Sequence, residues 1–175
     1  MVQTNLRKIT MAATLTALSV VIDILFKQFI PQGIQNVFGL PFYAIPLVIG
    51  SMLLGPIYGA MMGFVADYFA TMATGVPYAP WFVLAALVWG ILPGLLVKPK
   101  DNFIKIFIVI IITHALATMF NTYALSVYGW LRLNELFYVR LTLIPVNSII
   151  IGFIIYEVNR RLVPIYEDFK RKTSV

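Results

Sequence analysis

A single acidic side chain, Asp67, stands within a long apolar stretch of the sequence. Three glycines precede it at four-residue spacing, Gly55, Gly59 and Gly63. On a helix this spacing places the glycines on one face, where a second helix can approach backbone to backbone. A carboxylate inside a membrane is expensive and persists mainly where it faces a partner, a cavity or a ligand. The stretch therefore predicts a helix–helix interface and a binding site close to each other.

Further polar and aromatic side chains fall at a similar depth in the neighbouring apolar runs. Together with Asp67 they are the candidates for an outward-facing pocket: Asp67, Thr71, Tyr78, Trp81, Phe82, Asn121, Arg140, Asn147 and Lys27. Aromatic rings can stack on a flat heteroaromatic ligand, and a carboxylate can accept hydrogen bonds from its N–H and amino groups. Lys27, Arg132 or Arg140 can attract carboxylates. The pattern predicts a heteroaromatic ligand that carries anionic groups.

Several of these candidates also have a purely structural interpretation. Tyr78 and Trp81 are typical of the aromatic belt at a membrane surface. Arg140 can extend its side chain to that surface. Lys27 follows Asp23 by four residues, a spacing typical of an ion pair within one helix. Both interpretations stay open for these residues.

The composition indicates an integral membrane protein. Of 175 residues, 61% are hydrophobic and 11% are charged, which excludes an ordinary water-soluble globule. Cysteine is absent, so disulfides, thiolate catalysis and cysteine metal sites are excluded. The single histidine, His114, is interpreted as a hydrogen-bonding group between helices, because no second histidine can complete a metal site. We expect no cofactor.

Apolar runs separated by glycine, proline or charge predict an all-α bundle of six membrane-spanning helices, forming one domain over residues 1–175. The predicted spans are residues 9–30, 41–54, 56–74, 80–97, 103–128 and 138–162. The first run lacks a small-residue cleavage site after it, so we interpret it as a retained span. The longest polar connection, residues 31–40, is either a lid over the pocket or a plain connector.

The basic residues predict the orientation of the bundle. With six spans both termini lie on one side, together with ten basic residues: Arg7, Lys8, Lys98, Lys100, Lys105, Arg160, Arg161, Lys170, Arg171 and Lys172. Only Lys27, Arg132 and Arg140 remain for the other side. Positive charge collects on the cytoplasmic side, so both termini are expected in the cytoplasm. We interpret the basic tail as an anchor at anionic lipid and expect no nucleic-acid partner.

Several segments of the sequence, taken in their order along the chain, carry a resemblance to a known protein family. They are a short basic N-terminal segment, Ala13-Thr-Leu-Thr-Ala17, Pro46-Leu-Val-Ile-Gly-Ser-Met-Leu-Leu-Gly-Pro56, the run from Gly59 to Asp67, and Asn121-Thr-Tyr123. In this order the whole chain resembles the substrate-binding S components of energy-coupling factor (ECF) vitamin transporters. It looks most like the folate-specific members in four segments, Phe64-Val-Ala-Asp67-Tyr68, Tyr78-Ala-Pro-Trp-Phe82, Asn121-Thr-Tyr-Ala-Leu-Ser126 and Arg140-Leu-Thr-Leu-Ile-Pro145.

The resemblance implies a six-helix subunit that binds a vitamin from outside, topples in the membrane and releases it inward. It also implies partners: a transmembrane coupling protein that carries two ATPase subunits. The face of Ala13 and Ala17 is expected to dock on the coupling protein, since small residues allow helices to approach closely. Packing of these alanines inside the bundle is the alternative, and the face of Gly55, Gly59 and Gly63 suits either contact. No Walker motif is present, so the energy must come from the partners.

Other functions make different demands on the sequence. An S component for another vitamin, such as pantothenate, would share the scaffold and differ in a few pocket side chains. A small intramembrane enzyme would need paired acids or a His/Asp cluster at one depth, and we expect none. An assembly protein would not need Asp67, Asn121 and Arg140 to converge. The leading hypothesis is a folate-binding transport subunit.

Overall fold

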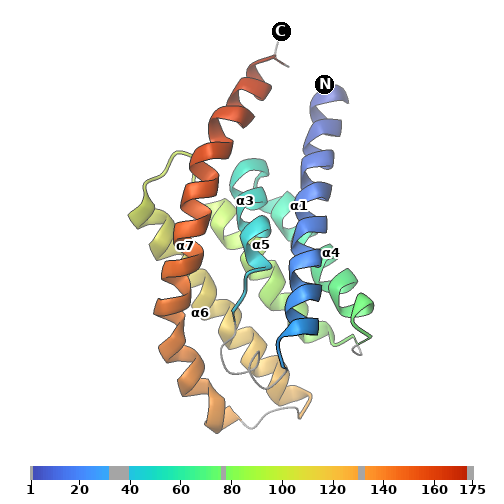
Figure 1. Cartoon of the computed structure of the whole chain (residues 1–175), viewed down its shortest axis with the longest axis vertical. Coiled ribbons are helices and arrows are strands. Elements are labelled where there is room, and N and C mark those ends of the chain that lie inside the picture. The colour runs from blue at the N-terminus through green and yellow to red at the C-terminus, as the bar shows by residue number, and fades with distance from the viewer. Residues whose placement is uncertain (1, 32–39, 76–77, 130–132, 173–175) are drawn as a thin grey trace.

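In this computed structural model the described residues, 2–31, 40–75, 78–129 and 133–172, form an all-helical bundle (Figure 1). Its elements are α1 (Val2–Phe29), α3 (Ala44–Leu54), α4 (Pro56–Ala73), the short 3-10 helix η1 (Pro80–Phe82), α5 (Val83–Leu96), α6 (Phe103–Val127) and α7 (Leu133–Lys172). Each predicted span corresponds to one α-helix. The helices α1 and α7 extend beyond the predicted apolar runs, because hydropathy marks the apolar part of a helix and not its polar ends.

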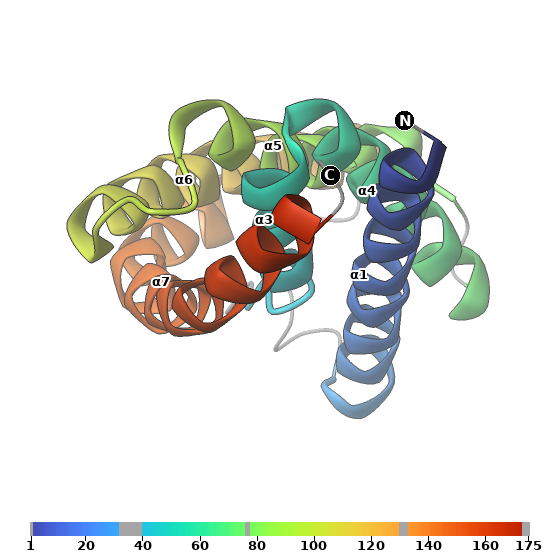
Figure 2. The ribbon, with the colours of Figure 1, turned by 90° about the horizontal axis from the view of Figure 1, so that it is seen from above.

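The centre of the bundle is α3, which contacts α1, α4, α5 and α7. Ten of its eleven residues are buried, as expected for a helix that is apolar on all sides. Seen from above, α3 lies between α1 on one side and α7 on the other (Figure 2). The helix is short because Pro41 lies before it and Gly55, with φ at 99°, ends it.

Large apolar side chains cover the outside of the bundle. On α6 they recur every three or four residues along one exposed face, at Ile104, Ile108, Ile112, Leu116, Met119, Tyr123 and Val127. A face of this kind suits lipid and not water. Three helical segments, Leu6–Phe29, Phe103–Val127 and Phe137–Asp168, are long and apolar enough to cross a membrane, and Ala44–Leu54 and Pro80–Leu96 are shorter apolar helices. Membrane helices are confirmed; the count of six spans remains a prediction.

The start of α1 and the end of α7 lie at the same end of the bundle, which we call the terminal end (Figure 1). The connection between α5 and α6 is tied to α7 at this end. The Asn159 side chain donates a hydrogen bond of 2.7 Å to the Pro99 carbonyl, and Lys100 forms an ion pair of 2.8 Å with Glu167. Basic residues predicted to share one side thus gather at one end, whereas Lys27 and Arg140 lie toward the opposite end. Which side of a membrane each end faces remains a prediction.

The glycines of α4 have two different uses. A Cβ atom on Gly59 would overlap the carbonyl group of Gly90 in α5, and a Cβ atom on Gly63 would lie 2.5 Å from the Ala86 carbonyl oxygen. The predicted close helix approach is therefore confirmed, and α5 is the helix that makes it. Both glycines are buried in this contact, so their face packs inside the bundle, which is one of the two contacts that the sequence left open. Gly55 does not share their face, since it forms the turn between α3 and α4 at positive φ.

Candidate functional site

Asp67 lies in the half of α4 that is remote from the terminal end. The helix begins at Pro56, so at 1.5 Å per residue Asp67 is roughly 16 Å along it. Its side chain is partly buried, and Oδ2 is fully enclosed. Among the residues that the structure describes, this oxygen has no hydrogen-bond partner. A buried acceptor without a donor is costly, so Asp67 is available to accept a hydrogen bond from a ligand.

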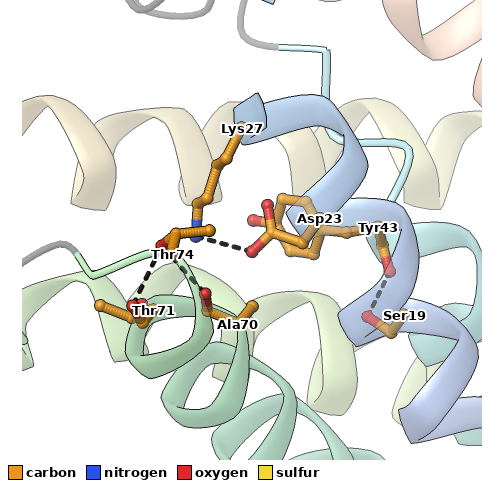
Figure 3. Close-up of polar contacts among 7 residues, drawn as sticks. All are labelled: Ser19, Asp23, Lys27, Tyr43, Ala70, Thr71 and Thr74. Carbon is orange, nitrogen blue, oxygen red and sulfur yellow. Dashed lines mark hydrogen bonds and ion pairs between the residues drawn. The ribbon is translucent and has the colours of Figure 1, made fainter. Parts of the chain in front are cut away.

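Two charged side chains of α1 lie next to Asp67. Lys27 Nζ donates to Asp23 Oδ2 over 2.8 Å, which confirms the ion pair predicted from their spacing (Figure 3). Only 15% of the Asp23 side chain and 29% of the Lys27 side chain are exposed. Both are close enough to Asp67 to act on its charge. The site therefore combines two carboxylates with one ammonium group.

Tyr43 connects this charged cluster to the centre of the bundle. It directly precedes α3, and its carbonyl oxygen accepts a hydrogen bond of 2.7 Å from Ser19 Oγ of α1 (Figure 3). Its hydroxyl hydrogen-bonds with the Asn121 side chain of α6, and Asp23 and Asp67 both act on it electrostatically. The structure thus places Asn121, Asp23 and Asp67 around Tyr43, with Lys27 in range of Asp67; a shared role in binding a ligand stays an expectation. Sequence reasoning missed Tyr43, because nothing in the local pattern distinguishes it from the other tyrosines.

The aromatic candidates approach the cluster to different degrees. Tyr78 lies within electrostatic range of Asp67 and packs edge to face on Tyr68, with 5.4 Å between ring centroids. Trp81 contacts the ring of Tyr123 over 5.7 Å. Tyr78 is therefore the aromatic candidate in electrostatic range of Asp67, and Trp81 packs against α6.

Phe82 and Trp81 share a partner on α6. Phe82 stacks on Tyr128 with 6.1 Å between centroids and 17° between the ring planes. The backbone N–H of Trp81 donates to the Tyr128 hydroxyl over 3.4 Å. These contacts attach η1 to the end of α6 and hold Trp81 and Phe82 in place.

The threonines after Asp67 differ in their roles. Thr74 Oγ1 donates to the carbonyl oxygens of Ala70 and Thr71, both over 3.0 Å, and so completes the end of α4 (Figure 3). Thr71 is partly buried one turn beyond Asp67. Of the two, Thr71 remains the candidate for the site.

The two candidates on α7 differ in their burial. Arg140 is partly buried and Asn147 is buried, and both interact with other groups of the protein. Next to Asn147, the hydroxyl of Ser148 hydrogen-bonds with Nδ1 of His114 over 3.1 Å. The interpretation of His114 as a link between helices is confirmed. Arg140 and Asn147 keep their roles as expectations.

Two predictions fall on residues outside the described part of the chain. They concern Arg132 as a cation at the entrance and the connection 31–40 as a lid or connector, of which residues 32–39 are not described.

Ala13 and Ala17 form a small-residue face on α1. Both are exposed, so they do not pack inside this bundle. The hydroxyls of Thr10 and Thr14 on the same helix donate to their own backbone, over 3.0 Å to Leu6 and 2.9 Å to Thr10. The face therefore presents little bulk and no side-chain hydrogen bond to another helix.

A comparison with protein families places these features in context. The family model for the substrate-specific component of ECF transporters matches residues 7–159, a range that includes every candidate site residue named above. Searches among curated proteins and among solved structures found no protein that matches the chain.

Proposed function

We propose that this chain, which belongs to the family of ECF transporter substrate-specific components, is the folate-binding subunit of a bacterial vitamin uptake transporter. Members of this family bind a vitamin and work with a membrane coupling protein and ATPases. The family is not an enzyme class. In our proposal the subunit binds folate from outside at the end remote from the termini and delivers it inward with its partners.

The observation that supports the folate assignment is the buried Oδ2 of Asp67, which has no hydrogen-bond partner in the part of the chain that the structure describes. A neutral pterin ring presents an N–H and an amino group side by side, and the two oxygens of one carboxylate can accept both. Tyr78 provides an aromatic face near this carboxylate. The cations Lys27 and Arg140 suit the acidic tail of folate. The remaining expected contacts come from Thr71, Trp81, Phe82, Asn121 and Asn147.

Calorimetry on the purified chain, without partners, tests this proposal. We expect one folate to bind per chain and no ATP to bind, since the sequence has no Walker motif. Pantothenate and other vitamins serve as competing ligands. Binding of another vitamin in place of folate would show that folate is not the substrate, and binding of no vitamin would refute the proposal.

We also propose that the exposed alanine face of α1 docks on the coupling protein. Ala17→Leu should reduce vitamin uptake by cells that contain the full transporter, because a bulky side chain holds the coupling helix away. Vitamin affinity of the isolated variant should be unchanged, since Ala17 is exposed and does not pack inside the bundle. An equal loss of affinity in detergent would show that the alanine serves the fold and not docking.

A further inference from the structure

The ion pair of α1 leaves an unusual arrangement of charge around Asp67. Lys27 is close enough to act on both carboxylates, yet its ammonium group lies 2.8 Å from Asp23 Oδ2, and Asp67 Oδ2 has no partner among the described residues. The Asp23 side chain is largely enclosed at 15% exposure. The ion pair of α1 is therefore largely enclosed and lies within electrostatic range of a second carboxylate.

We infer that Asp23 is a positioning residue that holds Lys27 away from Asp67 and thereby keeps the Asp67 carboxylate available to the ligand. This inference rests on the proposed role of Asp67 as the acceptor for the ligand's N–H groups. It assigns Asp23 a function in binding without any contact to the ligand.

The physical reason is competition for one ammonium group. In a site of low dielectric constant the attraction between opposite charges is strong, and the ammonium group of Lys27 lies against the carboxylate of Asp23. The spacing of four residues favours Asp23, because both groups lie on the same face of α1. Without the Asp23 charge, Asp67 is the remaining carboxylate within range, and an ion pair there would have to be broken before a ligand could bind.

The other polar groups around the cluster do not replace Asp23. Tyr43 and Asn121 face the cluster from the start of α3 and from α6, and they hydrogen-bond with each other. Tyr78 approaches Asp67 from the segment before η1. These groups are uncharged, so none of them competes with Asp67 for Lys27 as a carboxylate does.

Removing the charge of Asp23 with and without Lys27 tests the inference. The probe is a pterin that lacks the glutamate tail, so a contact between Lys27 and the tail does not contribute. We expect Asp23→Asn to weaken pterin binding about tenfold. In the Lys27→Met background the same Asp23→Asn change should have almost no effect, because no ammonium group remains to occupy Asp67. An equal loss in both backgrounds would overturn the inference.

The chain offers a matched control at the terminal end. Asp101 and Lys105 have the same spacing and form an ion pair of 2.6 Å. Asp101→Asn, with and without Lys105→Met, should leave pterin affinity unchanged. A loss of affinity in this control equal to that of Asp23→Asn would show a general effect of breaking ion pairs and would overturn the inference.

A measurement without ligand separates failure of this inference from failure of the proposed function. If the wild-type chain binds neither folate nor pterin, the proposed function fails, but the competition for Lys27 can still be measured by thermal unfolding. A double-mutant cycle of Lys27→Met and Asp67→Asn should show stronger coupling in the Asp23→Asn background than in the wild type. Equal coupling in both backgrounds would overturn the inference.

Discussion

Two pairs of residues with the same sequence spacing have different surroundings at the two ends of the bundle. Asp23 and Lys27 lie at the end remote from the termini, and Asp101 and Lys105 lie at the terminal end. Their ion pairs are similar in length, 2.8 and 2.6 Å. At the terminal end the Asp101 carboxylate also accepts a hydrogen bond of 2.7 Å from the Lys98 backbone. No such donor completes the charges at the other end, where the buried Oδ2 of Asp67 lacks a partner among the described residues.

The difference shows that a local motif acquires its role from its neighbours. The Asp101 pair begins α6 and belongs to a connection that is tied to α7 by Asn159 and Lys100. The contacts of this pair hold the connection and the start of α6 in place. The Asp23 pair stands beside a carboxylate that the described protein does not satisfy, and unsatisfied polar groups are expected at functional sites. We therefore expect substitutions at the terminal end to change stability and those around Asp67 to change binding.

The largest effect is expected from Gly59→Ala, which would disturb both ends at once. The added Cβ overlaps the Gly90 carbonyl of α5, and this backbone cannot rotate away. Overpacking of this kind should lower the free energy of unfolding by about 3 kcal/mol. Thermal unfolding in detergent measures the loss.

Gly152→Ala in α7 is the matched control for Gly59→Ala. Its Cβ would lie at an ordinary 3.5 Å from the Phe107 side chain. It should leave stability unchanged or raise it slightly, because alanine favours a helix over glycine. If Gly59→Ala were as stable as this control, the close contact between α4 and α5 would be wrong.

Asp67→Asn is expected to produce the largest loss of binding without loss of fold. The amide turns one acceptor into a donor that faces a donor of the pterin ring, so folate affinity should fall by one to two orders of magnitude, at about 1.4 kcal/mol per tenfold change. The melting temperature without ligand should stay level or rise, because an unpaired buried charge is removed. Asp101→Asn, measured in parallel, should leave affinity unchanged. Normal folate binding together with easier unfolding would instead assign Asp67 to the fold.

Arg140→Ala tests the expected contact between Arg140 and the acidic tail of folate. If its guanidinium contacts the acidic tail of folate, the loss should be about 1.5 kcal/mol, close to tenfold in affinity. A pterin without the tail should bind equally well to the variant and the wild type. Calorimetry with both ligands distinguishes the outcomes, and equal weakening of both would indicate a structural role for Arg140.

The smallest effect is expected from pH at the terminal end. Hydrogen bonds from the Lys105 side chain and the Lys98 backbone hold the pKa of Asp101 below its usual range. Stability from this carboxylate is therefore complete above the unfolded pKa of about 4 and is lost as the pH falls through the lower, folded value. Between about pH 6 and about pH 3, the melting temperature of the wild type should therefore fall by more than that of Asp101→Asn. If the melting temperatures of the two proteins fell equally with pH, Asp101 would not stabilise the fold.

The sequence alone determined the features that depend on local spacing. Apolar runs predicted where the helices lie, because the distance across a membrane sets their length. A spacing of four residues predicted the pair of Asp23 and Lys27, and the exceptional position of Asp67 marked it as a candidate for the site. These inferences needed only one helix at a time.

Only the tertiary structure decided which helices meet. It placed Gly59 and Gly63 against α5, brought Lys27 of α1 beside Asp67 of α4, and added Tyr43 through its contacts with Ser19 and Asn121. Spacing along a helix says which residues share a face, but the partner of that face depends on how all the helices pack together. For this reason the candidate carboxylate could be recognised in the sequence, and the lysine and tyrosine that surround it could be assigned only from the folded chain.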